Sequence, residues 1–91
     1  MTIRDSKRLA DMRRNPTGDW RVEDIAAVCR EAGIRFSAPS GGGSHYKVSH
    51  PAMRDILTIP SRRPVKAIYI RKLVRFIDAI QERDHNPDAE A

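Results

Sequence analysis

The chain has 91 residues, 40% of them hydrophobic, which suffices for one small domain with a modest core. Its one cysteine excludes an intrachain disulfide and fits a reducing compartment, and we expect a soluble, cytoplasmic protein because no apolar run could cross a bilayer or form a signal peptide. Seventeen Lys and Arg against twelve Asp and Glu give a net charge of +5, which favours polyanionic partners, although many small cytoplasmic proteins are basic.

Residues 1–18 are polar and basic, and we expect them to form an N-terminal extension of the domain. Leu9 and Met12 have the spacing of one helix face, which predicts a short, weakly anchored helix. The run from Asn15 to Gly18, with proline at its second position, is a turn signal that would end this helix.

Residues 20–32 carry the pattern of a first core helix. Apolar or small side chains recur at positions i, i+3, i+4 and i+7, namely Val22, Ile25, Ala26 and Cys29. Thr17 or Asp19 would cap the start of this helix, and Gly33 would end it in the left-handed conformation.

After this helix the hydrophobic period changes to that of strands. Ile34 and Phe36 alternate with polar residues, which predicts a short first strand over residues 34–37. Residues 44–50 form the expected second strand, and residues 55–59 form a third that ends at proline. Because the connections are short, the strands should pair as an antiparallel meander.

The last helix has the clearest apolar stripe in the chain, and Pro64 suits its first turn. The stripe consists of Ile70, Leu73, Val74, Ile77 and Ile80. Charged residues occupy much of the opposite face, namely Arg71, Lys72, Arg75, Asp78 and Glu82. Residues 84–91 form an acidic tail without apolar anchors, which we expect to be disordered, so the domain would cover residues 19–83.

These elements predict an α+β fold with the core order helix, strand, strand, strand, helix. A three-stranded antiparallel sheet with both helices on one face would bury both apolar stripes and leave the other sheet face open. The result would be a two-layer sandwich of helices on a sheet.

Strand alternation gives His45 a defined place. If Tyr46 and Val48 face the helices, His45, Lys47 and Ser49 share the open face of the sheet. An imidazole can accept or donate a proton near neutral pH, and an ammonium can offset charge that grows on a phosphoryl oxygen. RNA carries its own nucleophile, the 2′-hydroxyl, so such a pair could cleave it without a metal. A lone surface histidine is, however, more often without function.

Other site chemistries fit the sequence less well. His45 and His50 are separated by an odd number of residues and would point to opposite sheet faces, while Cys29 belongs to a core stripe. Neither a zinc site nor a Cys–His nucleophile is therefore expected. The glycine run before Ser44 is not followed by the Gly-Lys-Ser/Thr of a P-loop. We expect no cofactor.

Two further features suggest contact with a phosphate backbone. Arg62, Arg63 and Lys66 precede the last helix, where unpaired N–H groups favour anions, although a solvated loop is an equal alternative. Gly41–Gly43 would leave clearance for a backbone beside Ser44, or could simply form a flexible linker.

Three short motifs occur in a characteristic order: Gly43-Ser44-His45 at the second strand, Leu57-Thr58-Ile59-Pro60 at the third, and Ile70-Arg71-Lys72-Leu73 in the last helix. With them, the chain from about Trp20 to Gln81 resembles the HicA family of toxins, small mRNA interferases of bacterial toxin–antitoxin pairs. The resemblance implies a fold like the double-stranded RNA-binding domain and metal-independent cleavage of mRNA with His45 as the catalytic residue. It also implies a HicB-like antitoxin protein as the partner that masks the active site.

We therefore expect an endoribonuclease in which His45 is the general base or acid and Lys47 stabilises phosphoryl charge. The residues expected to contact RNA are Gly43, Ser44, Arg62, Arg63 and Lys66. The sequence is also compatible with two other functions: a non-catalytic RNA-binding module of the same fold, and a protein-interaction domain that uses the open sheet face.

Overall fold

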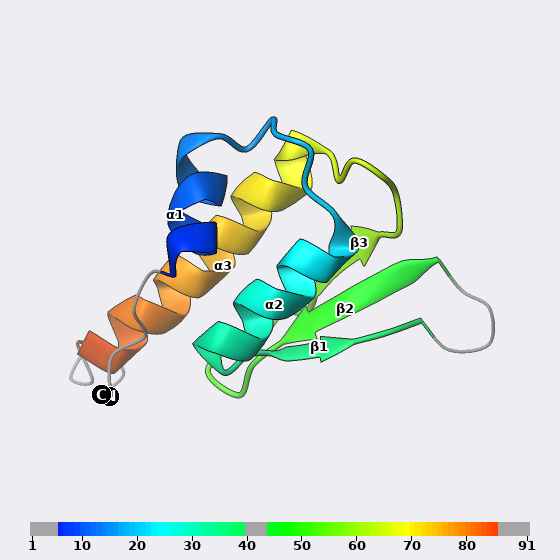
Figure 1. Ribbon diagram of the computed structural model, residues 1–91. Coiled ribbons are helices and arrows are strands. Elements are labelled where there is room, and N and C mark those ends of the chain that lie inside the picture. The colour runs from blue at the N-terminus through cyan, green and yellow to red at the C-terminus, as the bar shows by residue number, and fades with distance from the viewer. Residues whose placement is uncertain (1–5, 40–43, 86–91) are drawn as a thin grey trace.

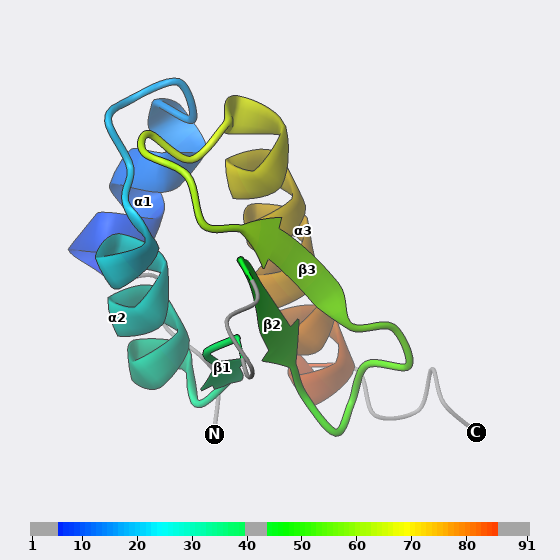
Figure 2. The same cartoon turned by 90° about the vertical axis from the view of Figure 1, so that its right-hand side faces the viewer.

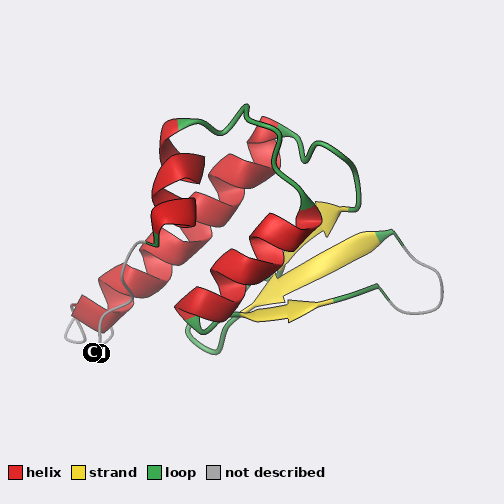
Figure 3. Cartoon of the chain, in the orientation of Figure 1, coloured by secondary structure: helices red, strands yellow, loops and turns green. Residues whose placement is uncertain are grey.

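Three helices and a three-stranded antiparallel sheet form the part of the chain that the computed structural model describes, residues 6–39 and 44–85 (Figure 1, Figure 3). In chain order the elements are α1 (Lys7–Arg14), α2 (Val22–Ala32), β1 (Arg35–Ser37), β2 (His45–Ser49), β3 (Leu57–Pro60) and α3 (Ala67–His85). The predicted α+β class is confirmed, and α1 joins the two predicted core helices.

Helix α1 is firmly packed, so the prediction of weak anchoring was wrong. Leu9 and Met12 are 1% and 0% exposed and belong to the same core as α2 and α3. The hydroxyl of Ser6 accepts a hydrogen bond from the N–H of Leu9 (3.0 Å) and caps the helix. The predicted turn is confirmed: the N–H of Gly18 donates to the carbonyl of Asn15 (3.1 Å). Two apolar side chains suffice as anchors because both are completely enclosed.

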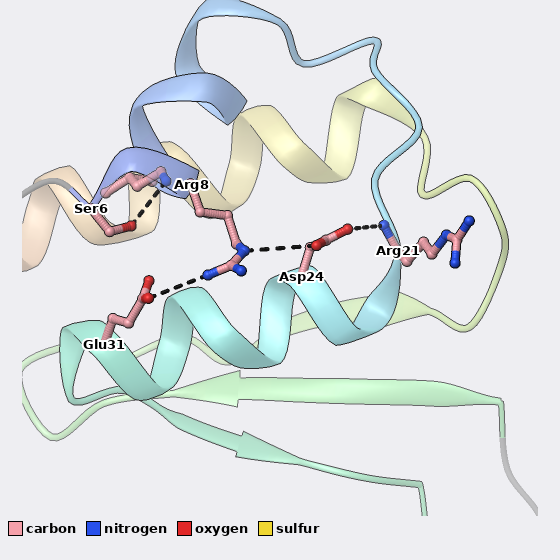
Figure 4. Close-up of polar contacts among 6 residues, drawn as sticks. Ser6, Arg8, Arg21, Asp24 and Glu31 are labelled. Carbon is pink, nitrogen blue, oxygen red and sulfur yellow. Dashed lines mark hydrogen bonds and ion pairs between the residues drawn. The ribbon is translucent and has the colours of Figure 1, made fainter.

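Ion pairs also join α1 to both other helices. Arg8 Nη1 lies 3.3 Å from Glu31 Oε2, and Arg8 Nε lies 3.7 Å from Asp24 Oδ1, both on α2 (Figure 4). Arg13 donates two hydrogen bonds to the Asp78 carboxylate on α3, at 2.8 and 2.9 Å. All these side chains are partly exposed, and such pairs stabilise by about 0–1 kcal/mol each. The buried side chains therefore attach α1, and the ion pairs orient it.

Helix α2 begins at Val22 with Arg21 as its N-cap, so the predicted capping by Thr17 or Asp19 is wrong. The carboxylate of Asp24 accepts a hydrogen bond from the N–H of Arg21 (2.9 Å). The acidic side chain in the first turn thus bonds back to the N–H of the cap residue itself, whereas the predicted caps would have accepted from N–H groups within the helix.

The buried face of α2 consists of Ile25, Ala27, Val28 and Cys29. It is rotated slightly from the predicted stripe, because Val22 and Ala26 are only half-buried. Gly33 has a φ of 72° and forms the left-handed C-cap, as predicted.

The strand order β1-β2-β3 with antiparallel neighbours confirms the predicted meander. β1 begins one residue later than predicted, and β3 runs from Leu57 through Pro60, whose partner in β2 is His45. The N–H of Ser61 donates to the carbonyl of Ser44 (2.6 Å), so the next ladder bond lies one pair beyond Pro60. Proline fits here because its missing N–H would point to the free edge of the sheet.

One face of the sheet packs against the helices. The side chains on it are Phe36, Tyr46, Val48, Leu57 and Ile59, as the strand register places them together. Val48 and Ile59 are fully buried, and the rings of Phe36 and Tyr46 stack with their centroids 5.1 Å apart. Helix α2 lies near β1 and α3 near β3, both on this side (Figure 1, Figure 2).

The predicted stripe of α3 is confirmed, since all five of its side chains are at most 8% exposed. The helix starts at Ala67, so the placement of Pro64 in its first turn was wrong. The reason is a tertiary bond: the N–H of Val65 donates to the carbonyl of Trp20 (2.8 Å) and the Val65 side chain is buried. This contact holds the preceding segment outside the helix.

Helix α3 extends through Asp84 and His85, so the prediction that these two residues belong to a disordered tail is wrong. Residues 86–91 lie outside the described residues. Within residues 6–39 and 44–85, none of the helices has the length and hydropathy needed to cross a membrane.

Candidate functional site

The face of the sheet turned away from the helices carries polar side chains. We call it the open face and define it by Arg35, Ser37, His45, Lys47, Ser49 and Thr58. His45 and Lys47 are both exposed. The register places Lys47 between Ser37 of β1 and Thr58 of β3, while His45 lies opposite Pro60. The predicted alternation of β2 is therefore confirmed.

The imidazole of His45 has a neighbour that sequence reasoning did not identify as a partner. Ser44 Oγ lies 3.4 Å from His45 Nδ1, a distance at the outer limit of a hydrogen bond. When Nδ1 is occupied in this way, Nε2 is the nitrogen left to exchange a proton with a bound molecule. The Ser44 backbone is fixed by the bond from Ser61 at the end of β3. Gly43, predicted to contact RNA, lies outside the described residues.

The basic segment lies beside this end of the sheet. Arg62, Arg63 and Lys66 are all exposed, and Lys66 is the last residue before α3. The N–H of Arg62 donates to the carbonyl of Pro60 (2.9 Å), which turns the chain sharply after β3. Because Pro60 is the strand partner of His45, the fold brings Arg62 close to the candidate catalytic histidine, from 17 positions away in the sequence.

A pocket opens where β3 meets α3, and we call it the β3–α3 pocket. It is lined by Pro60, Arg62, Lys66 and Tyr69. Two of the predicted RNA-binding residues thus share one hollow, while Arg63 is not among the lining residues. Sequence reasoning missed Tyr69 entirely, because nothing local marks a single tyrosine just before the apolar stripe as a residue that lines a pocket.

A cation lies over the ring of Tyr69. Lys72 Nζ is 5.7 Å from the ring centroid, within the range of a cation–π contact. The sequence pattern placed Lys72 only on the charged face of the last helix. Its relation to Tyr69 follows from their spacing of three residues, which puts both side chains on one side of the helix.

Two other candidate groups do not join this site. Cys29 is fully buried, and burial raises the pKa of its thiol from 9.0 to about 12, so it stays protonated and unreactive at neutral pH. His50 lies beyond β2, where its Nδ1 accepts a hydrogen bond from the N–H of Ala52 (3.0 Å) in a turn. Among the described residues, no three His, Cys, Asp or Glu side chains come together as a metal site would require.

The arrangement combines one proton-transfer group with several cations and no nearby carboxylate among the residues that define the open face and line the pocket. Its cations are suited to binding a phosphodiester, and its imidazole is suited to exchanging a proton with the bound group. Comparisons of the chain with known protein families, with curated proteins and with solved structures found no match.

Proposed function

We propose that this protein is a metal-independent endoribonuclease that cleaves mRNA and so inhibits translation and growth. The observation that carries the proposal is the exposure of His45 and Lys47 on one sheet face, together with the pairing of His45 to Pro60, which lines a pocket with Arg62 and Lys66. The resemblance to the HicA toxins supports the same activity.

In the proposed reaction, His45 takes the proton of a ribose 2′-hydroxyl. The 2′-oxygen then forms a bond to the adjacent phosphorus as the bond from phosphorus to the 5′-oxygen breaks, and the 5′-oxygen receives a proton from the imidazolium or from water. The products are a 2′,3′-cyclic phosphate and a 5′-hydroxyl end. Lys47 stabilises the charge on the phosphoryl oxygens, and Arg62, Arg63 and Lys66 hold the strand.

The fold is consistent with an RNA ligand, although it does not identify the RNA sequence. An antiparallel sheet with two helices on one face is compatible with the double-stranded RNA-binding-domain fold that the resemblance implies, with α1 as an additional element. By the same resemblance, the natural partner would be a HicB-like antitoxin that covers the open face and blocks access to His45.

The direct test is incubation of the purified protein with RNA in the presence of a chelator. We expect cleavage by the wild type and at least a hundredfold loss of rate in His45→Ala, with unchanged thermal unfolding, because general acid–base catalysis contributes about 10²–10⁴-fold. Arg75→Gln, which removes a cation from another surface, is the control and should cleave normally.

Cleavage by His45→Ala at the wild-type rate would refute the catalytic assignment. Salt-sensitive RNA binding by the wild type without any cleavage would support a non-catalytic RNA-binding module. The absence of RNA binding even at low salt would leave a protein-interaction domain.

A further inference from the structure

The β3–α3 pocket combines Arg62 and Lys66, which hold the strand in the proposed reaction, with Tyr69, which that reaction does not use. Its free volume is about 70 Å³, whereas one water needs about 10–15 Å³ by the same measure. The pocket therefore has room for a group considerably larger than water, such as a phosphate.

Three of the four lining residues carry hydrogen-bond donors on their side chains. Arg62 and Lys66 supply positive charge, and neither has an acidic partner among the side chains that are described, those of residues 6–39 and 44–82. Tyr69 supplies a phenol whose hydroxyl has no hydrogen bond to any other described residue. Two cations and a neutral donor around one hollow form a set that suits an oxyanion.

The ring of Tyr69 is held in place and is poorly placed to stack on a base. It is half-buried and packs against the core, and Lys72 Nζ lies over the ring at 5.7 Å. The hydroxyl, not the ring face, is therefore the part of Tyr69 that a ligand can use. Lys72 adds a further positive charge next to the pocket.

The pocket is adjacent to the candidate catalytic histidine. Pro60, one of its walls, is the β3 partner of His45, and such directly opposed residues have Cα atoms about 4.5–5.5 Å apart. A strand whose scissile phosphate lies at His45 on the open face would bring a neighbouring phosphate to this corner of the sheet.

We propose that the β3–α3 pocket is a subsite for a backbone phosphate next to the linkage that is cut, with the Tyr69 hydroxyl as a specific donor. The place of this subsite in a cleavage reaction rests on the proposed function, but its binding role does not. The subsite would position the RNA so that the 2′-hydroxyl faces His45.

The test measures binding in a His45→Ala background, so that cleavage cannot interfere. The probe is a short fluorescein-labelled oligoribonucleotide of mixed sequence, followed by anisotropy. Tyr69→Phe removes only the hydroxyl and should weaken binding about three- to tenfold. Tyr46→Phe is the matched control: Tyr46 is the only other tyrosine, it faces the helices, and its change should leave binding unaltered.

Salt dependence separates the charged from the neutral groups. Arg62→Gln should weaken binding and lower the slope of log K against log salt by about 0.7, the value for one phosphate contact on a single strand. Tyr69→Phe should weaken binding with the slope unchanged, because it removes no charge.

If Tyr69→Phe binds as tightly as its parent, the subsite proposal is overturned. If Tyr69→Phe and Tyr46→Phe lose affinity equally, the effect is not specific to the pocket and the proposal also fails. A wild type that binds RNA through Tyr69 but does not cleave it would refute the proposed function while upholding the phosphate subsite.

Discussion

At the scale of single residues, two side chains that are both capable of chemistry, an imidazole and a thiol, have opposite surroundings. His45 is exposed beside Ser44 at the start of β2, where its ring can exchange protons with a ligand. Cys29 is enclosed by the core, and burial raises the pKa of its thiol to about 12. Position in the fold therefore separates a candidate catalyst from a packing residue.

The Cys29 thiol should resist alkylation in the folded protein. The thiolate is the reactive form, and a folded-state pKa of about 12 leaves almost none of it at pH 8. We expect iodoacetamide to label the guanidinium-unfolded protein within minutes and the native protein at a rate at least a hundredfold lower, measured by mass spectrometry. Rapid labelling of the native protein would contradict the burial of Cys29.

The same shift makes stability depend on pH. The unfolded thiol loses its proton near pH 9 while the folded one keeps it, so the contribution of Cys29 is present below pH 9 and is lost as pH rises towards 12. The free energy of unfolding of the wild type should thus fall more steeply between pH 8 and pH 10 than that of Cys29→Ala, as urea titrations can show.

At the scale of elements, α1 is a full member of the fold. Its apolar side chains reach the core between α2 and α3, while its arginines contact carboxylates at the surface. The buried side chains contribute more to the free energy of unfolding, because burial of a large apolar side chain stabilises the fold more than a partly exposed ion pair does.

Met12→Ala should lower the free energy of unfolding by about 2–5 kcal/mol, because it leaves a cavity in the core. Arg13→Gln, which breaks the pair with Asp78, should lower it by less than about 1 kcal/mol. Ile68→Ala is the control for lost apolar volume, since Ile68 is 53% exposed and its truncation should have little effect. Urea unfolding measures all three, and a near-neutral Met12→Ala would show that α1 does not stabilise the fold.

At the scale of the whole molecule, two surfaces that each carry a pair of cations can be compared as sites for a polyanion. One surface contains Arg35 and Lys47 of the open face. The other contains Arg71 and Arg75, which line a hollow at the junction of α1 and α3, on the side of the helices away from the sheet (Figure 1). Net charge alone cannot tell which surface binds a polyanion.

Charge-matched double variants distinguish the two surfaces. Arg35→Gln with Lys47→Gln should weaken RNA binding about tenfold or more, measured as filter retention near physiological salt, because two phosphate contacts are lost. Arg71→Gln with Arg75→Gln removes the same charge and should change binding by less than about twofold. The reverse order of effects would assign RNA to the helical surface and refute the site on the open face.

Much of the fold follows from periodicity along the chain. The α3 stripe, the Gly33 cap and the alternation in β2 are local properties, set by 3.6- and two-residue periods and by the backbone freedom of glycine. These features put His45 and Lys47 on one face of a sheet before any tertiary contact is known. Local signals failed at helix starts. Arg21 is the N-cap of α2 and is bonded by Asp24, and the anchored Val65 keeps the segment before Ala67 out of α3.

The sequence by itself thus determined the order of the elements, the core stripes and the face on which His45 lies. Only the tertiary structure decided that α1 belongs to the core and that Tyr69 shares a pocket with Arg62 next to the strand partner of His45. The physical reason is that a period specifies which side chains share one face of an element. The distance between two elements depends on how their buried side chains pack, and no local pattern contains that distance.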